Sequence, residues 1–256
     1  MIEFIPFQLF LFSIAIFANT LSAFAGGGAG LIQLPLLIFL GLPFSIALAT
    51  HKVASIALGL GSSLRLINES RLNNFLSIFI LAVGIPGVVL GANFTLYFSE
   101  NFSSIILGIL TLSLGIFSAK QSELGIIEQE ISLSHKRLAI GGVILFVIGF
   151  LNGSLSSGTG LFVTLWLVRF FGLTYSRAVG HTLILVGFFW NGIGALVLGL
   201  NGQIKWSWLP MLVLGSILGG YIGAHLSILK GNRLVKLFFE IISIFIGITL
   251  VIRGLK

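Results

Sequence analysis

Long apolar segments are the feature that most constrains what this chain can fold into. In the first half they occupy residues 4–25, 44–64, 75–98 and 101–119. Each has about 20 residues, and a helix of that length crosses roughly 30 Å of hydrocarbon. Because water is absent there, every backbone polar group must be paired within the protein, which a helix achieves within one segment. We therefore predict an all-α polytopic membrane protein.

The composition excludes an ordinary soluble domain. Hydrophobic residues make up 57% of the chain and charged residues 8%, whereas soluble domains carry about 25% charged residues. The net charge of +7 comes from basic residues at the expected ends of the spans, so orientation in the membrane explains it better than a nucleic-acid partner. An acid and no basic side chain precede the segment at 4–25, so we expect a helix of the mature protein rather than a signal peptide.

The second half of the chain repeats the pattern of the first. The matching pairs are Gly30 with Gly160, Gly41 with Gly172, Gly61 with Gly192, Gly87 with Gly219, Gly91 with Gly223, and Gly115 with Gly247. Their separation drifts from 130 to 132 residues along the chain, which indicates small loop insertions in a duplicated sequence. We predict two homologous transmembrane repeats, at 1–119 and 138–256, joined by a polar, solvated linker at 120–137.

The short apolar pieces at 30–40 and 160–171 decide how the two repeats are oriented. If each crosses the membrane together with the extended glycine stretch before it, each half has an odd number of crossings and the repeats are inverted. If each is re-entrant, the number is even and the repeats are parallel. Inversion places ten basic residues on one side and three on the other, against eight and five for parallel repeats. The positive-inside tendency therefore favours inversion, with both termini outside. The ten are Arg65, Arg71, Lys120, Lys136, Arg137, Arg169, Arg177, Lys230, Arg233 and Lys236, and the three are Lys205, Arg253 and Lys256.

A glycine-rich break precedes each short piece, at 25–30 and at 156–160. Unwound backbone at membrane depth is tolerated only where it is buried in protein or lines a cavity, and matching breaks in two halves point to the binding site of a transporter. The first amides of the following helices would attract an anion. The candidate binding residues here are Gly26, Gly27, Gly28, Gly30, Ser156, Ser157, Gly158, Thr159 and Gly160. The alternative is that these glycines only permit close helix packing.

Lys52 lies near the middle of an expected span, on a small and polar helix face that includes Ser55. A lysine at that depth costs roughly 3 kcal/mol or more unless it is compensated. We predict that Lys52 is the countercharge for an anionic substrate. The alternative is a lysine that reaches the membrane surface or bonds to carbonyl groups.

Further polar residues within the spans complete the set of candidates, namely Thr50, His51, His181, Thr182 and Asn191. His51 and His181 could carry a coupled proton or donate a hydrogen bond to an oxyanion, or they could serve only as structural hydrogen-bonding groups. Gln33 and Asn152 flank the breaks and are further candidates. For Glu240 we predict a local ion pair with Lys236, four residues earlier on the same helix.

The breaks and the segments that follow them resemble the TauE/SafE family of sulfite and organosulfonate exporters. The residues that carry the resemblance are the two glycine-rich motifs, at 26–31 and 157–161, and the helix starts Ala49-Thr50 and Gly180-His181. The chain departs from the family pattern with Ala49 in place of glycine and His181 in place of threonine. The resemblance implies a transporter of the bacterial inner membrane for small anions, often sulfur oxyanions or sulfonates.

The resulting hypothesis is a secondary transporter or exporter of a small oxyanion that works by alternating access. Its expected partners are the anion, the lipid bilayer, protons or Na⁺ as coupling ions, and a second copy in a homo-oligomer. We expect no cofactor, no bound metal and no nucleic acid. The chain has neither Asp nor Cys, nor a nucleotide-binding or His-Glu-x-x-His motif, which argues against an intramembrane enzyme. The alternative is a membrane scaffold or assembly factor that transports nothing.

Overall fold

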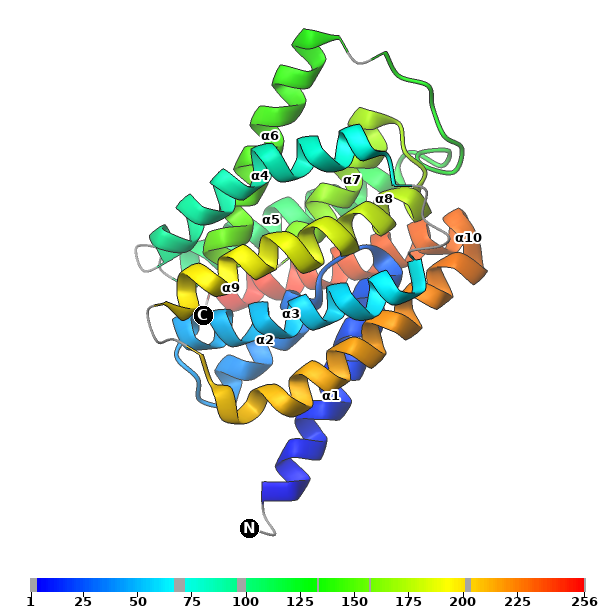
Figure 1. Cartoon of the computed structure of the whole chain (residues 1–256). Coiled ribbons are helices and arrows are strands. Elements are labelled where there is room, and N and C mark those ends of the chain that lie inside the picture. The colour runs from blue at the N-terminus through cyan, green and yellow to red at the C-terminus, as the bar shows by residue number, and fades with distance from the viewer. Residues whose placement is uncertain are drawn as a thin grey trace.

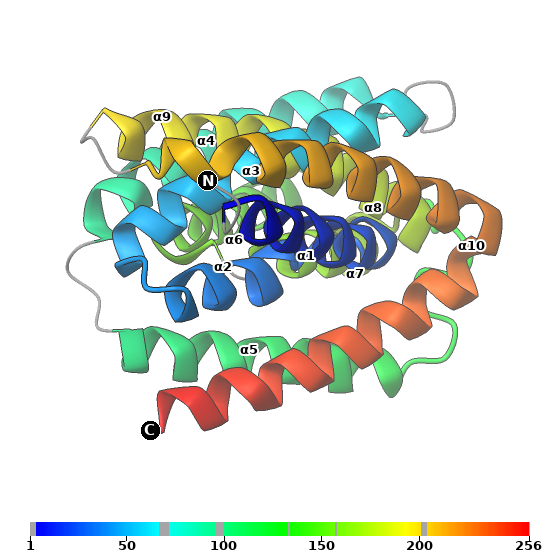
Figure 2. The same ribbon diagram turned by 90° about the horizontal axis from the view of Figure 1, so that it is seen from below.

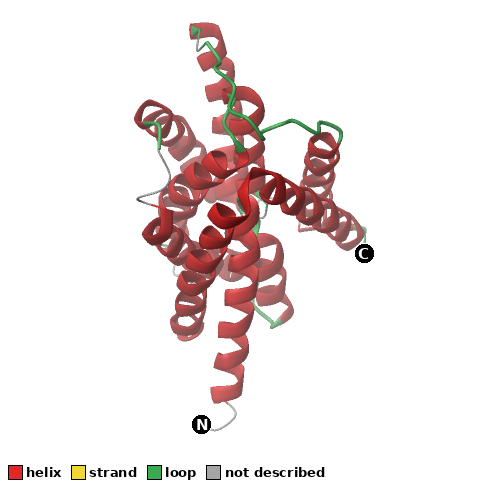
Figure 3. Cartoon of the chain, turned by 90° about the vertical axis from the view of Figure 1, so that its right-hand side faces the viewer, coloured by secondary structure: helices red, strands yellow, loops and turns green. Residues whose placement is uncertain are grey.

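The computed structural model describes residues 4–66, 72–95, 100–132, 134–156, 158–200 and 204–255, which form helices and connecting loops with no strand (Figure 3). The first half contains α1 (Phe4–Ala25), α2 (Ala29–Phe39), α3 (Phe44–Leu66), α4 (Asn74–Phe94) and α5 (Glu100–Ala119). The second half contains α6 (His135–Leu155), α7 (Thr159–Phe171), α8 (Tyr175–His181), the π-helix η2 (Thr182–Trp190), α9 (Asn191–Gly199), the short 3₁₀ helix η3 (Trp206–Trp208) and α10 (Leu209–Gly254). The prediction of an all-α polytopic protein is confirmed.

Several helices are long and apolar enough to cross a membrane. In the described ranges there are six: α1, α3, α4, α6, the continuous segment Tyr175–Gly199, and Trp206–Gly254. The last of these bends at Gly231, whose φ of 74° and ψ of 174° are not helical, so α10 forms two arms. The short helices α2 and α7 have only 11 and 13 residues.

Glycines allow the longest helices to pack backbone against backbone. A Cβ atom added at Gly223 would lie 2.3 Å from the carbonyl oxygen of Thr20 in α1, and one added at Gly91 would lie 2.0 Å from that of Phe150 in α6. The first arm of α10 therefore packs closely against α1, and α4 packs closely against α6. Small residues permit such close contacts between helices in a membrane.

The helices α1 and α6 enter the bundle from opposite ends and converge near its middle, as Figure 1 shows. A separate layer is formed by α5 and the second arm of α10, which lie side by side (Figure 2). Their close approach depends on Gly108 beside Val251 and on Gly247 beside Leu112. The short helices α2 and α7 lie between this layer and the layer that contains α3, α4, α9 and the first arm of α10 (Figure 2). The two breaks can meet there.

The linker predicted at 120–137 ends earlier than expected and is packed against other parts of the chain. The helix α6 begins at His135, with the Ser134 side chain accepting a hydrogen bond from the Arg137 amide, so residues 135–137 belong to a helix. The preceding part is attached to the second half of the chain. Asn232 donates to the carbonyl oxygen of Ile126 at 2.9 Å, and the Tyr175 amide donates to that of Gly125 at 2.9 Å. The linker is polar, but it is docked rather than freely solvated.

A buried polar cluster joins α5, α8 and the second arm of α10. The Lys236 ammonium lies 2.5 Å from a Glu240 carboxylate oxygen, which confirms the predicted local ion pair. The pair also has partners from other helices: Ser118 donates to Glu240 at 2.8 Å, and its hydroxyl lies 2.7 Å from that of Tyr175. The cluster therefore fixes three helices to one another.

Candidate functional site

The two glycine-rich breaks contact each other in the interior of the protein. A Cβ atom added at Gly27 would lie 2.6 Å from the carbonyl carbon of Gly160, and one added at Gly160 would lie 2.9 Å from the Cα atom of Gly27. No side chain larger than hydrogen fits at this crossing. The Thr164 hydroxyl adds a direct link by donating to the carbonyl oxygen of Gly26 at 2.6 Å. The starts of α2 and α7 are therefore held together.

Both helices begin without a side-chain cap. Gly28 and Gly158 are the N-cap residues of α2 and α7, and both have left-handed backbone conformations, with φ of 100° and 74°. By contrast, α4, α6 and α8 begin with side-chain caps from Asn73, Ser134 and Thr174. The first amides of a helix have no partner within a regular helix, and a glycine N-cap has no side chain with which to cap them. Two helix starts therefore direct their positive dipole ends to the same place.

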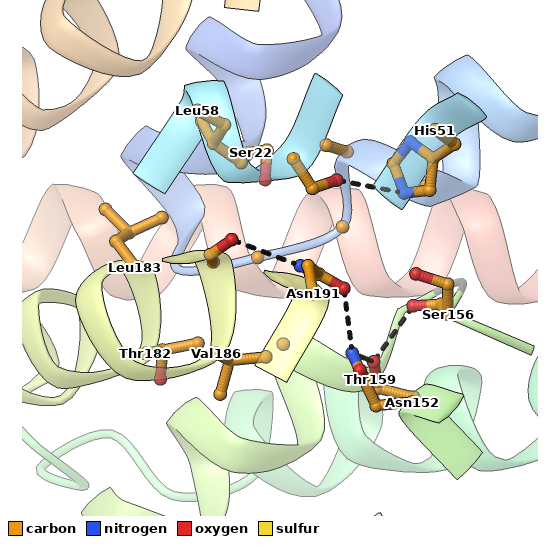
Figure 4. A pocket seen from close by; sticks show the side chains of 17 residues that line it. Ser22, His51, Leu58, Asn152, Ser156, Thr159, Thr182, Leu183, Val186 and Asn191 are labelled. Atoms are coloured by element: carbon orange, nitrogen blue, oxygen red, sulfur yellow. Dashed lines mark hydrogen bonds between the residues drawn. The ribbon is translucent and has the colours of Figure 1, made fainter. Parts of the chain in front are cut away.

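A polar cavity of about 40 Å³ lies at this meeting point. One buried water needs roughly 10–15 Å³ by the same measure, so the cavity has room for a solute of a few heavy atoms. The first half contributes Ser22, Gly27, Gly28, Ala29, Gly30, His51, Ser55 and Leu58 to its lining, and the second half contributes Asn152, Ser156, Thr159, Gly160, Thr182, Leu183, Val186, Gly187 and Asn191. Figure 4 shows these side chains around the unwound segments.

On the first-half side, the lining combines an unpaired hydroxyl with an oriented imidazole. The Ser22 hydroxyl is buried at the cavity and has no hydrogen-bond partner in the described part of the chain. His51 Nδ1 lies 2.8 Å from Gln33 Oε1, and His51 Nε2 lies 3.2 Å from the Ser55 hydroxyl. Because the amide oxygen can only accept, Nδ1 carries the hydrogen and Nε2 accepts from Ser55 in the neutral ring.

On the second-half side, amides and hydroxyls form one connected network. Asn152 Nδ2 donates to the Thr159 hydroxyl at 2.9 Å, which donates to the carbonyl oxygen of Ser156 at 2.9 Å. Asn191 Oδ1 accepts a weaker hydrogen bond from Asn152 Nδ2 at 3.5 Å. These bonds are drawn in Figure 4. The network links Asn152 of α6 and Asn191 of α9 to Thr159 at the start of α7.

The π-helix η2 brings the second half of the chain to the cavity. It occupies nine residues, and five of the lining residues lie in it or directly after it: Thr182, Leu183, Val186, Gly187 and Asn191. A π-helix is rare and is found frequently at functional sites. Gly187 packs against Gly59 of α3, where a Cβ atom added at Gly187 would lie 3.3 Å from the Gly59 Cα atom.

Lys52 lies immediately behind the cavity wall. Its side chain is 0% exposed. The ammonium donates to the backbone oxygen of Asn152 at 2.7 Å and to the side-chain oxygens of Asn152 and Asn191, both at 3.3 Å. No carboxylate pairs with it in the described ranges. Lys52 therefore bonds to carbonyl groups, as the alternative interpretation states, and its positive charge orients two amides that do line the cavity.

Ten of the predicted binding residues line the cavity: Gly27, Gly28, Gly30, His51, Ser55, Ser156, Thr159, Gly160, Thr182 and Asn191. Gly26 and Gly158 lie directly beside it in the breaks. Ser157 lies outside the described residues.

Two predicted residues lie elsewhere. Thr50 accepts from the Lys205 amide at 2.9 Å, near the start of α3. His181 accepts from the Asn73 amide at 3.1 Å and donates to the Arg177 carbonyl oxygen at 2.8 Å. Both groups have structural partners, and neither is among the lining residues.

Sequence reasoning missed Ser22, Ala29, Leu58, Leu183, Val186 and Gly187, and gave Asn152 a secondary place. Ser22 lies three residues before the first break, so its position on the last turn of α1 was the available signal. Nothing in the sequence indicated the π-helix, which determines where Val186 and Gly187 point.

The cavity lining carries donors but no acid. It includes hydroxyls, amides, one imidazole and backbone amides, while no Glu is among the lining residues. In the described part of the chain, no cluster of His and acidic residues is suited to hold a metal ion. The described part of the lining can therefore surround a small polar or anionic solute with polar groups and no carboxylate.

A model of the sulfite exporter TauE/SafE family matches residues 11–250 of this chain. The chain belongs to the TauE/SafE family. Among its TauE/SafE relatives, a probable membrane transporter protein of Haemophilus influenzae is 30% identical over 233 residues, which cover 91% of this chain and 90% of that protein. YfcA of Escherichia coli strain K12, also a probable membrane transporter protein, is 26% identical over 236 residues, or 91% of this chain and 85% of YfcA.

A more distant TauE/SafE relative is the probable membrane transporter protein YunE of Bacillus subtilis, 24% identical over 268 residues that cover 94% of this chain and 96% of YunE. No solved structure matches the chain significantly. Family, relatives and membrane spans together identify a multi-pass transporter of the cell membrane.

Proposed function

We propose that this protein transports a small oxyanion, such as sulfite, a related sulfur oxyanion or a short organosulfonate, by alternating access. The observation that carries the proposal is the meeting of two helix starts with glycine N-caps at one polar cavity. Helix N-termini favour anions because the helix dipole is positive there and the backbone N–H groups point toward the ligand. In transporters, half-helices of this kind meet the substrate near the middle of the bilayer.

The side chains around the cavity favour the same class of solute. The unpaired Ser22 hydroxyl is a donor without a protein acceptor. Lys52 adds one positive charge behind Asn152 and Asn191, and the low dielectric of the interior lets that charge act over several ångströms. A neutral or cationic solute would not need this combination. The cavity volume of about 40 Å³ favours a compact anion over a large organic molecule.

His51 is the proposed carrier of a coupled proton. When the ring is neutral, Ser55 donates to Nε2, so the hydrogen of that hydroxyl is engaged by the ring. When the ring is protonated, Nε2 becomes a donor to Ser55, and the Ser55 hydrogen is free to turn toward an anion. Protonation of His51 thus adds both a positive charge and a hydrogen-bond donor to the cavity. An anion in the cavity would in turn stabilise the protonated ring, so the anion and the proton would be transported together.

The contacts between helices support inverted repeats. Thr50 meets Lys205, and Gln8 donates to the carbonyl oxygen of Ser207 at 3.1 Å, so α1, α3 and the first arm of α10 begin at one end. The Asn73 amide meets His181, so α4 and α8 begin at the opposite end, where α3 finishes. Matching helices of the two halves would then run in opposite directions. Inverted halves that meet at a central site can rock against each other to expose it alternately.

The proposal is tested by flux into proteoliposomes that contain the purified protein. Radiolabelled sulfite, sulfate, thiosulfate and short alkanesulfonates are compared with a neutral solute, and protein-free vesicles give the background. We expect saturable flux of at least one of these anions and none of the neutral solute. Flux of none of them by folded protein would overturn the proposal. Replacing Gly192, whose Cβ position is open, with alanine provides a variant that should behave as wild type.

A further inference from the structure

Two apolar crevices lie on the outside of the bundle, away from the polar cavity. The first, here called the α7 crevice, has a volume of about 360 Å³ and lies between α5, α6 and α7. The second, here called the α1 crevice, has a volume of about 350 Å³ and lies between α1 and the two arms of α10. Both have the size of small-molecule sites, which begin at roughly 300 Å³.

Each crevice is apolar along its length and has a basic residue in its lining. Val147 and Leu110 in the α7 crevice and Leu234 in the α1 crevice are more than a third exposed, so both crevices open to the surface that faces lipid. Arg169 is the one charged residue that lines the α7 crevice, and Lys230 is the one that lines the α1 crevice. In the described ranges, neither side chain has a hydrogen-bond or ion-pair partner.

Both basic residues lie at the same end of the bundle. Arg169 is in the last turn of α7, next to the turn that leads into α8. Lys230 immediately precedes the bend of α10 at Gly231, close to the contact between Arg65 and His225 at the end of α3. This is the end that collects most of the basic residues. By the positive-inside tendency it faces the cytoplasm, where anionic lipids attract basic groups.

A second cation lies beside Arg169. Arg137 donates to the carbonyl oxygen of Phe170 at 2.7 Å, and its guanidinium lies 4.8 Å from the centre of the Phe170 ring. Phe170 in turn stacks on Trp166, which lines the α7 crevice. The mouth of this crevice therefore presents positive charge, and its interior presents only apolar surface.

We propose that each crevice binds one anionic phospholipid, with an acyl chain between the helices and the phosphate against Arg169 or Lys230. A phospholipid has the same two-part character as each crevice, because an apolar chain is joined to a charged group at one end. A zwitterionic lipid would bring its own cation toward the basic residues, so an anionic headgroup such as phosphatidylglycerol fits better. Basic pockets between transmembrane helices on the cytoplasmic side bind such headgroups.

Quenching of Trp166 fluorescence tests the α7 crevice. Replacing Trp190, Trp206 and Trp208 with Phe leaves one tryptophan, and the protein is reconstituted with dibrominated phosphatidylglycerol or dibrominated phosphatidylcholine of identical chains. We expect stronger quenching by phosphatidylglycerol. The excess should disappear in Arg169→Gln and persist in Lys230→Gln, the matched change at the other crevice. Equal quenching by the two lipids, or an excess that survives Arg169→Gln, would overturn the proposal.

Native mass spectrometry tests both crevices with the tryptophans intact. The protein is released from micelles with phosphatidylglycerol or phosphatidylcholine, and the retained lipids are counted. We expect two retained phosphatidylglycerol molecules on the wild type, weaker retention of one of them in each single variant, and weaker retention of both in the double variant. Loss of one basic contact should weaken retention about fivefold. Lys205→Gln, at the opposite end, should retain both. Equal retention of phosphatidylcholine, or no change in the double variant, would contradict lipid binding without bearing on anion transport.

Discussion

The two halves of the molecule have a similar arrangement of helices, but they contribute different functional groups to the cavity. At matching positions, His51 and Lys52 of the first half correspond to Thr182 and Leu183 of the second. The helix α3 is regular throughout, whereas its counterpart contains the nine-residue π-helix η2. The first half therefore supplies the titratable and charged groups, and the second half supplies the amides and most of the hydroxyls. The two broken helices begin in the same way in both halves, while the side chains around them differ.

The halves also depend on each other at the site. Lys52 of the first half bonds to Asn152 and Asn191 of the second, and Thr164 of the second half bonds to Gly26 of the first. Each half thus completes the hydrogen bonds of the other. A change in one half should therefore disturb the other half's share of the cavity.

The largest effect is expected for Gly27→Ala. The added methyl group would lie 2.6 Å from the Gly160 backbone, and the φ of 137° is unfavourable for alanine. Because backbone atoms cannot move aside cheaply, the two helix starts should separate. We expect transport to be lost and thermal stability to fall, measured as flux and as the melting temperature of purified protein.

Gly192→Ala is the control for this change, since nothing lies within 4 Å of its Cβ position. Alanine favours a helix over glycine by about 1 kcal/mol, so this variant should be as stable as wild type or more so. Normal flux in a folded Gly27→Ala protein would show that the contact between the breaks is not needed.

The next largest effect is expected for Lys52→Met, which keeps the volume of the side chain and removes its charge. The oxygens of Asn152 and Asn191 would lose their common donor, and one unsatisfied buried group costs about 1–3 kcal/mol. We expect flux to fall about 10- to 100-fold, since 1.4 kcal/mol corresponds to about tenfold. Lys205→Met, on the exposed surface, is the matched control. Equal flux in both variants would remove Lys52 from any role in anion binding.

A smaller and more specific effect separates the two histidines. If His51 carries the coupled proton, acceleration of anion flux by an imposed pH gradient should vanish in His51→Gln. It should persist in His181→Gln, because both ring nitrogens of His181 are bonded to backbone groups away from the cavity. Flux is measured with and without the gradient in each variant. A response that survives in His51→Gln and is lost in His181→Gln would assign the proton to the other half.

The arrangement of helices along the chain could be predicted from the sequence. The lengths of the apolar segments and the spacing of the glycines can be recognised without knowing the tertiary contacts. The first span was expected at 4–25 and is found at Phe4–Ala25, and the short piece expected at 160–171 is found at Thr159–Phe171. These features follow from local sequence and from the thickness of a membrane.

The partners of the site residues could not be predicted in the same way. Lys52 contacts residues that are 100 and 139 positions away, and such contacts depend on the tertiary fold. His181 was predicted together with His51 as an imidazole within a span, yet it lies beside Asn73 because its helix begins at the opposite end of the bundle. The π-helix shifts the register of the lining residues by an amount that hydrophobic periodicity does not reveal.

The smallest effect is expected for Ser22→Ala, and it gives the sharpest comparison between the halves. The Ser22 hydroxyl has no partner within the described residues, so its removal should leave stability unchanged and cost the anion one donor. We expect KM for the anion to rise about three- to tenfold with little change in maximal flux, because one hydrogen bond contributes about 1 kcal/mol. Thr159→Val removes the hydroxyl that connects Asn152 to Ser156, so it should lower the melting temperature as well as affinity. If Ser22→Ala lowered stability and left KM unchanged, the hydroxyl would serve packing rather than binding, and the first half would contact the anion through its backbone, His51 and Ser55.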